Sequence, residues 1–331
     1  MDKKLSISTS PFLKDETTTP MIMWQVVYTL IPVLAVSFFY FGLSAVFITL
    51  TSVFSCILTE WFFDKNRSTY SIKDGSAIIT GILLALTLPP GFPLWMVFLG
   101  GVVSIGMGKV IWGGLGQNIF NPALLGRAFL QAAFPTAITT WTPPDGRYFQ
   151  LRGTNAALPF FQGVNVDGIT SATPLSRMKF DHVTTDLKDL MIGNIEGSLG
   201  ETCGALLLLA MAYLIYKKII NWHIPASILL TVLVFSGIFY LINPEIYPSP
   251  LFMVFSGGLL LGAVYMATDL VTSPITPRGI WIYGIGIGLL VVLIRLWGGL
   301  PEGVMYAILL MNAATPLINR FTKIRTYGHR K

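Results

Sequence analysis

Charged residues are scarce in this sequence of 331 residues. Asp, Glu, Lys and Arg make up 11% of it, whereas 53% is hydrophobic; an ordinary soluble domain has about 25% charged residues. The composition therefore excludes an ordinary soluble domain and indicates an integral membrane protein surrounded by lipid. Basic residues outnumber acidic ones, but on such a chain this excess is typical of cytoplasmic loops, so we expect no nucleic-acid partner.

Cysteine and histidine are also rare. The only two cysteines, Cys56 and Cys203, lie far apart inside apolar runs, and the chain has three histidines and no C-x-x-C pair. Zinc and iron–sulfur sites need several such ligands at short spacing. The sequence therefore predicts no metal site of its own, and a metal cluster would have to be shared with another subunit.

Long apolar runs take the place of the missing polar residues. About 20 apolar residues are needed to cross a hydrocarbon core of about 30 Å. We expect ten spans, of which the third and fifth are short, at about 24–42, 44–63, 76–89, 94–112, 119–134, 202–220, 224–242, 251–268, 280–296 and 303–319. The predicted fold is therefore all-α and multi-pass.

Basic residues gather on one set of short connections between these spans. They are Lys3, Lys4, Lys14, Lys65, Arg67, Lys73, Lys109, Lys217, Lys218, Arg278, Arg320, Lys323, Arg325, Arg330 and Lys331. The opposite connections carry almost none, with Arg295 at a helix end as the exception. By the positive-inside rule we expect both termini in the cytoplasm and the long loop at 135–201 on the outer face.

Two distant segments resemble each other. PGFPLWMVFLGGVVSIGMGKVIWGGL at 90–115 and PITPRGIWIYGIGIGLLVVLIRLWGGL at 274–300 both run from P-x-x-P through an apolar span to W-G-G-L. With five spans in each half, a repeated sequence must cross the membrane in opposite senses, which predicts an inverted five-plus-five repeat. The expected parts are a cytoplasmic segment 1–23, a first membrane repeat 24–134, an outer loop 135–201, a second repeat 202–319 and a basic cytoplasmic tail 320–331.

Proline interrupts the apolar pattern at 85–93 and at 267–277. Proline removes helix hydrogen bonds, and non-helical backbone at membrane depth is tolerated only inside protein or beside a water-filled cavity. Asp269 in the second break is a candidate ion contact, since an acid next to a span is often functional. Two alternatives stay open: the breaks are ordinary loops at the membrane edge, and the further acids near span ends, Glu60, Asp74 and Glu302, are solvated at the interface.

A third polar stretch, GGLGQNIFNPALLGRAF at 113–129, carries two amides and an arginine. Asn118, Asn121 and Arg127 are spaced so that, in a helix opened by Pro122, the arginine and an amide can approach one face. A buried arginine needs a carboxylate or a phosphate-like ligand as partner. These residues are candidate flavin or ion contacts; the alternative partners for Arg127 are helix-end or loop carbonyls.

The outer loop contains DGITSATPL at 167–175. Small residues let a bulky partner approach the backbone, and Pro174 favours an extended Thr173 with an accessible hydroxyl. Because no histidine or carboxylate stands in an obvious activating position, we interpret Thr173 as an attachment point and predict no catalytic residue. Capping of a turn is the alternative role for such a threonine.

The loop motif and several blocks elsewhere resemble a known family, the flavinylated membrane subunits of the Rnf and Nqr respiratory complexes. The blocks include DGSAIITGILLALTLPP at 74–90, GNIEGSLGET at 193–202 and ATDLVTSPITPRG at 267–279. The resemblance implies that a flavin transferase joins FMN through a phosphoester bond to Thr173. It implies a motif formed by Asp167, Thr170, Ser171, Ala172, Thr173 and Pro174, with Ser171 where the family usually has glycine and Leu270 where it commonly has proline.

The resemblance also implies a function. The short N-terminal segment is more similar to the D-type subunits of Rnf complexes, which couple electron flow between ferredoxin and NAD to Na⁺ or H⁺ movement in a bacterial inner membrane. We expect other Rnf-type subunits as partners, and a second, noncovalent flavin such as riboflavin stays open. The alternatives are a B-type subunit of a sodium-pumping NADH:quinone reductase, a flavin-free channel or transporter, and a scaffold for neighbouring subunits.

Overall fold

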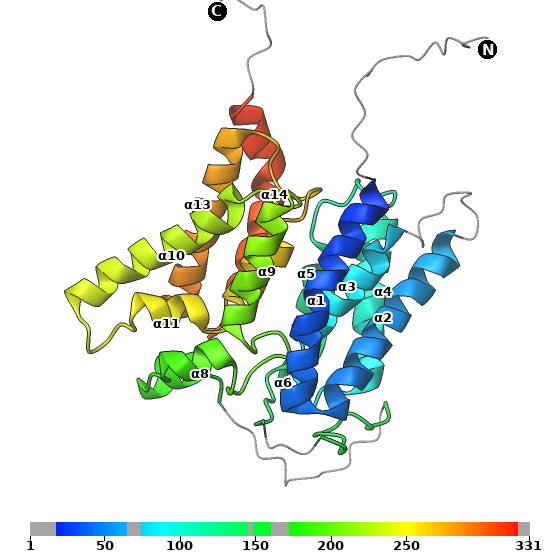
Figure 1. The fold of residues 1–331 in the computed structure, drawn as a ribbon, viewed down its shortest axis with the longest axis horizontal. Helices are drawn as coiled ribbons and strands as arrows, with labels where there is room; N and C mark the ends of the chain where they lie inside the picture. The colour runs from blue at the N-terminus through cyan, green and yellow to red at the C-terminus, as the bar shows by residue number, and fades with distance from the viewer. Residues whose placement is uncertain (1–17, 65–73, 145–147, 160–171, 324–331) are drawn as a thin grey trace, which may run out of the picture.

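The computed structural model describes residues 18–64, 74–144, 148–159 and 172–323. Every regular element in these ranges is helical (Figure 1), which confirms the all-α prediction. Four helices are long and apolar enough to cross a membrane, as expected for a membrane protein. The predictions for the ends of the chain before residue 18 and after residue 323 lie outside the described residues.

The helices of the N-terminal half follow the expected spans closely. They are α1 (Thr19–Phe41), α2 (Leu43–Asp64), α3 (Ser76–Leu86), α4 (Leu94–Ile105) with the π-helical turn η2 (Gly106–Val110), α5 (Pro122–Ala133) and α6 (Pro135–Ile138). The fifth span begins later than expected because Asn121 caps α5, its Oδ1 accepting from the backbone N–H groups of Ala123 and Leu124. The third ends at Leu86, before Pro89 and Pro90.

The C-terminal half is preceded by short helices in the outer loop. These are α7 (Pro174–Ser176), η3 (Arg177–Asp181) and α8 (Leu187–Ile192). The second half contains α9 (Gly204–Tyr216), α10 (His223–Ile242), α11 (Pro250–Phe255), α12 (Leu259–Leu261), η4 (Gly262–Met266), α13 (Pro277–Trp297) and α14 (Val304–Phe321).

The span expected at 251–268 is broken between α11 and α12. Gly257 has a φ of +64°, a left-handed conformation that glycine adopts at little cost. The backbone groups freed by the break are bonded by distant side chains: Arg295 donates to the carbonyls of Met253 and Ser256, and Glu302 accepts from the Gly258 N–H. The break is therefore stabilised by residues that lie about forty positions later in the chain.

The break at 85–93 is also enclosed by protein. The Leu86 and Leu88 carbonyls accept hydrogen bonds from the backbone N–H groups of Gly200 and Leu199, at 2.7 and 3.1 Å. Asn155 donates to the carbonyls of Pro90 and Phe92. This surrounding protein is the setting that non-helical backbone needs at membrane depth, so the break is more than a loop at the edge of the molecule.

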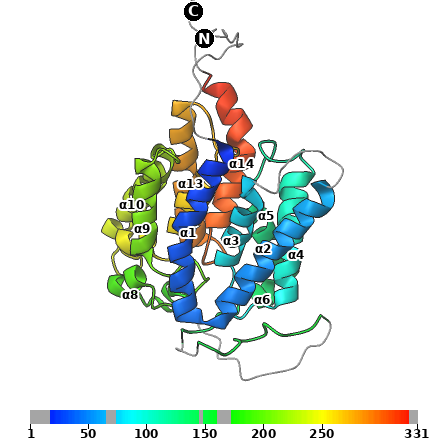
Figure 2. The ribbon, with the colours of Figure 1, turned by 45° about the vertical axis from the view of Figure 1, so that its right-hand side comes forward.

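The first helices of the two halves run antiparallel. Near the start of α1, Gln25 accepts a hydrogen bond from Tyr213 near the end of α9, at 2.8 Å. Near the end of α1, Ser37 donates to the Leu199 carbonyl just before α9. Figure 1 shows that α1 begins and α14 ends at one end of the molecule, and that α8 lies at the other end. The turned view also places α2 to α5 on one side and α9 and α10 on the other (Figure 2).

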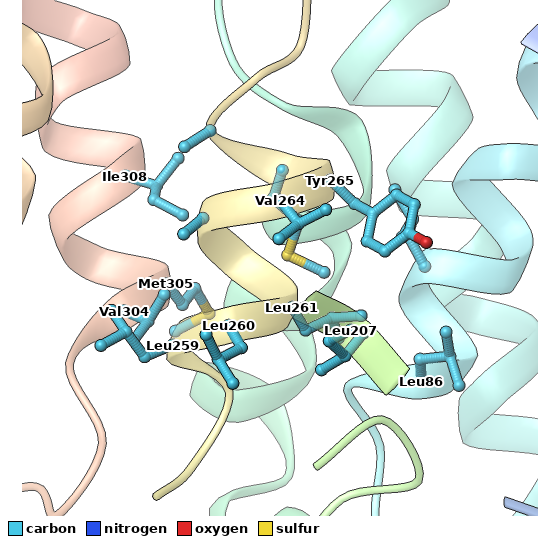
Figure 3. Packing of buried hydrophobic residues seen from close by; sticks show 14 of the residues in the cluster. Leu86, Leu207, Leu259, Leu260, Leu261, Val264, Tyr265, Val304, Met305 and Ile308 are labelled. Carbon is cyan, nitrogen blue, oxygen red and sulfur yellow. The ribbon is translucent and has the colours of Figure 1, made fainter. Parts of the chain in front are cut away.

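The short pieces α12 and η4 pass through the centre between the halves. Figure 3 shows their buried side chains, such as Leu261, Val264 and Tyr265, against residues of α3, α9 and α14. The labelled neighbours are Leu86, Leu207, Val304, Met305 and Ile308. In lipid such contacts stabilise helix association mainly through close packing. This central position carries the residues after η4, including Asp269, towards the N-terminal half.

Candidate functional site

Thr173 is the N-cap residue of α7. Its φ of −60° and ψ of 156° are extended, as the following proline predicts. Its Oγ1 accepts from the Ser176 backbone N–H at 3.2 Å and lies 2.9 Å from the Ser176 hydroxyl. The prediction that the hydroxyl is accessible was wrong: Thr173 is only 6% exposed, because the following residues pack against the protein. Thr173 Oγ1 therefore caps α7, and it is also the oxygen to which the predicted flavin would be attached.

The rest of the loop motif is only partly described. Ala172 is half-buried and Pro174 is buried at the first position of α7. Asp167, Thr170 and Ser171 lie outside the described residues. We call residues 173–181, which form the start of α7 through η3, the attachment segment. It lies near the end of α13, at the end of the molecule opposite the start of α1.

A cavity of about 110 Å³ lies at the other end, between the two halves. Its walls come from the start of α1, from α3 and η2, from the chain before α5, from the end of α9 and from η4. Three of the candidate residues, Asn118, Asn121 and Asp269, line it together with Lys109 and Tyr265. The structure therefore brings together candidates that are about 150 residues apart in the chain.

Asp269 is oriented by three neighbours. Its carboxylate accepts from the Val271 N–H and the Thr272 hydroxyl, each at 3.3 Å, and from Asn118 Nδ2 at 3.5 Å. Asn121 makes its hydrogen bonds elsewhere: it caps α5 and donates to the Met266 carbonyl at 3.1 Å. The three neighbours all donate to Asp269, so its carboxylate is held in place on the cavity wall as an anionic oxygen ligand, the kind that hard cations prefer.

Arg127 does not line this cavity. It lies further along α5, is 8% exposed, and makes no hydrogen bond or ion pair with the residues that the structure describes. The predicted approach of Arg127 to an amide is not seen, since the polar atoms of Asn121 bond to the α5 backbone and to Met266. The positive charge of Arg127 acts to lower the pKa of Glu201, a buried acid in the loop before α9, against the larger effect of burial.

Burial raises the pKa of Glu201 to about 7, and the negative charge of Glu302 acts in the same direction. The hydrogen bond from Ser198, at 2.8 Å, and the positive charge of Arg127 oppose this shift. Glu201 was not predicted as a candidate, although it lies in one of the blocks that carry the family resemblance. Its closeness to Arg127 and Glu302 depends on chain folding, which no local pattern reveals.

The basic residue Lys109 is another side chain whose role was not predicted. The expectation that it lies on a connection between spans is wrong, because it is buried in η2 and its ammonium donates to Glu60 at 2.5 Å and to the Ser76 hydroxyl at 2.6 Å. Glu60 is correspondingly a buried partner rather than an acid solvated at the interface. A lysine and a glutamate inside apolar runs were the available signal in the sequence.

Known proteins resemble this chain along nearly its whole length. A D subunit of a proton-translocating ferredoxin:NAD(+) oxidoreductase complex from Clostridium ljungdahlii is 40% identical over 98% of this chain and 97% of that protein. A D subunit of a Na(+)-translocating ferredoxin:NAD(+) oxidoreductase complex from Acetobacterium woodii is 41% identical over 98% and 95%. A D subunit of an ion-translocating oxidoreductase complex from Stutzerimonas stutzeri is 40% identical over 93% and 91%.

The match to a protein family covers both halves of the molecule, the attachment segment and the cavity. It extends over residues 6–328. The chain therefore belongs to the NQR2, RnfD, RnfE family.

Proposed function

We propose that this chain is the D-type subunit of an ion-translocating ferredoxin:NAD oxidoreductase complex, and that it carries FMN on Thr173. Support for the first part comes from the named relatives, which are D subunits of such complexes. Two of them differ in the ion, a proton or Na⁺, while being 40% and 41% identical to this chain. Overall similarity therefore does not select the ion.

The observation that carries the flavin assignment is the setting of the Thr173 oxygen. A phosphoester leaves Oγ1 in place as an ester oxygen, which can still accept the bond from the Ser176 N–H. The oxygen loses only its own proton, and the Ser176 hydroxyl beside it can donate in return. The hydrogen bonds at this oxygen are thus compatible with an esterified threonine.

Attachment needs an activated donor and a transferase. The Thr173 oxygen forms a bond to the phosphorus on the flavin side of a flavin dinucleotide, and the phosphoanhydride bond breaks. FMN stays on the threonine, and the other nucleotide leaves as its monophosphate. The hydroxyl proton passes to a base on the transferase, because Thr173 Oγ1 has only Ser176 as a described hydrogen-bond partner. Once bound, FMN supplies the electron transfer that the side chains of this chain lack.

We assign the cavity beside Asp269 to a cation. Its volume of about 110 Å³ is below the roughly 150 Å³ of an engineered cavity that binds benzene. Three fused flavin rings therefore do not fit without displacement of the walls, whereas a cation with a few waters does. The noncovalent riboflavin considered above is not placed here, and Asn118 and Asp269 are the proposed cation contacts.

The proposed topology is an inverted repeat of five plus five helical segments. Its support is the antiparallel arrangement of α1 and α9, together with a matching order of contacts. In the first half α2 packs on α3 and α4, and α4 on α5; in the second α10 packs on α11 and α13, and α13 on α14. We propose that the end with the start of α1 faces the cytoplasm and the attachment segment the outside of a bacterial inner membrane.

The test is in-gel flavin fluorescence of the denatured protein, made with and without a flavin transferase. Three forms are compared: the wild type, Thr173→Ala and Thr173→Ser. We expect fluorescence in the wild type, none in Thr173→Ala, and signal in Thr173→Ser because a serine hydroxyl can form the same ester. Absence of fluorescence in the wild type would favour a flavin-free transporter or a scaffold. In a reconstituted complex, quinone in place of ferredoxin as the required substrate would favour the B-type quinone-reductase subunit.

A further inference from the structure

The attachment segment is seated on the second half of the molecule. Leu175 is buried, and an added Cβ at Gly257 would lie 2.6 Å from Leu175 Cδ1 and 2.5 Å from a Glu302 oxygen. The missing side chain of Gly257 therefore provides the space that Leu175 occupies. The segment thus packs directly onto the break between α11 and α12.

One lysine fastens the segment to the end of α13. Lys179 Nζ donates to the carbonyls of Ile294 at 3.3 Å, of Leu300 at 2.9 Å, and of Gly298. The Ile294 carbonyl also accepts from the Gly298 N–H, whereas Gly298 and Leu300 follow the end of α13, where a cation interacts favourably with the helix dipole. All three donors of the ammonium group are used, so Lys179 joins the segment to the end of α13 in addition to the packing of Leu175. Burial lowers the pKa of Lys179, which agrees with a partly enclosed ammonium.

The seated segment conflicts with access of a flavin transferase to Thr173. A transferase must bring a phosphorus atom to the Thr173 oxygen, yet Thr173 is 6% exposed and its hydroxyl is bonded within the segment. A transferase active site has to surround this oxygen, which needs more open space around Thr173 than the seated segment leaves. The segment must therefore leave its seat for transfer to occur.

We propose that Lys179 is the positioning residue of the attachment segment. Flavin transfer takes place with the segment released, and the three bonds to the end of α13 then hold the esterified threonine in a fixed place on the second half. The part concerning flavin rests on the function proposed above. The packing of the segment through Lys179 does not depend on flavin, so the packing and the flavin attachment can be tested separately.

The first experiment is hydrogen–deuterium exchange on the full chain without flavin. We expect Lys179→Met to raise the exchange rate of a peptide covering 172–183 by about tenfold, from the loss of hydrogen bonds to a charged group. Lys179→Arg should restore slow exchange, since a guanidinium can also donate to carbonyls. Exchange in α10 and α13 reports whether the variants remain folded.

The matched control is Arg177→Met. Arg177 lies in the same segment but forms an exposed ion pair with Glu196, at 2.6 Å, and such pairs contribute little. We expect wild-type exchange over 172–183 in this control. Equal exchange in Lys179→Met and the wild type, with both proteins folded, would overturn the proposal.

The second experiment measures flavin transfer to the folded chain and the motion of the attached flavin. If release limits transfer, Lys179→Met should be flavinylated faster than the wild type, by the same factor as the exchange rate. The fluorescence anisotropy of its covalent flavin should be lower, and Lys179→Arg should resemble the wild type in both. Slower transfer or unchanged anisotropy in Lys179→Met contradicts the proposal. Absence of covalent flavin in every form contradicts the proposed function instead, while the exchange result still stands.

Discussion

The Lys109 ammonium lies 2.5 Å from the Glu60 carboxylate, joining η2 to α2 beside the cavity, with both side chains at most 4% exposed. A second buried basic residue, Arg295, pairs with Glu302 at 3.1 Å near the opposite end of the molecule. Each basic residue comes shortly before a W-G-G-L sequence, one in each half. The two halves thus place a buried basic residue with an acidic partner at opposite ends, which agrees with the proposed inverted repeat.

Breaking the first pair should destabilise the protein. Lys109→Met leaves a buried carboxylate without its ammonium partner, and removal of one member of such a pair costs about 3–5 kcal/mol. We expect Lys109→Met and Glu60→Gln each to have a lower Tm in detergent than the wild type, with unfolding monitored by tryptophan fluorescence. The double variant should lose less than the sum of the two single losses. Simple additivity would show that the pair is not coupled.

Glu201 should make stability depend on pH. Its pKa in the folded protein is raised from 4.5 to about 7, so the folded state binds the proton more tightly than the unfolded state does. Its favourable contribution is therefore complete below about pH 4.5 and is lost as the pH rises through about 7. We expect Glu201→Gln to have a higher Tm than the wild type at about pH 8 and little difference at about pH 5. The control Glu196→Gln, at a half-buried position in the same loop, should follow the wild type at both pH values.

A methyl group at Gly126 should be poorly tolerated. Its Cβ would lie 1.9 Å from Ser104 Oγ and 2.8 Å from the backbone oxygen of Gly100, which cannot easily move. We expect Gly126→Ala to cost about 1–3 kcal/mol through overpacking of α5 against α4. Gly106→Ala is the control, because nothing lies within 4 Å of the added Cβ. Equal Tm values for the two variants would show that the α4–α5 contact adapts.

Asp269→Asn tests the proposed cation site. The substitution keeps the size of the side chain but removes the only acidic charge among the described residues that line the cavity. We expect a strong loss of ion transport in the reconstituted complex, with the covalent flavin retained in gels. Asp186→Asn, at an exposed position before α8, should transport as the wild type does. Unchanged transport by Asp269→Asn would remove the cavity from the ion path.

Some of this architecture was predictable because its causes are local. The apolar runs predicted the helices, and the prolines predicted a break at 85–93, since proline lacks the N–H that a helix needs; α3 ends at Leu86, three residues before the expected end of the third span. The break at Ser256 to Gly258 was not predicted, because the groups that stabilise it, Arg295 and Glu302, come from later in the chain. Burial of the Thr173 hydroxyl was missed for the same reason, since it depends on where the attachment segment packs.

By itself, the sequence determined a lipid-embedded helical chain, the positions of its proline breaks and the family resemblance. These follow from composition, from proline chemistry and from motifs read along the chain. Only the tertiary structure decided that Asn118 meets Asp269, that Lys109 pairs with Glu60 and that Lys179 reaches the end of α13. Such pairings join residues far apart in the chain, and their distances are set by how helices of the two halves pack together.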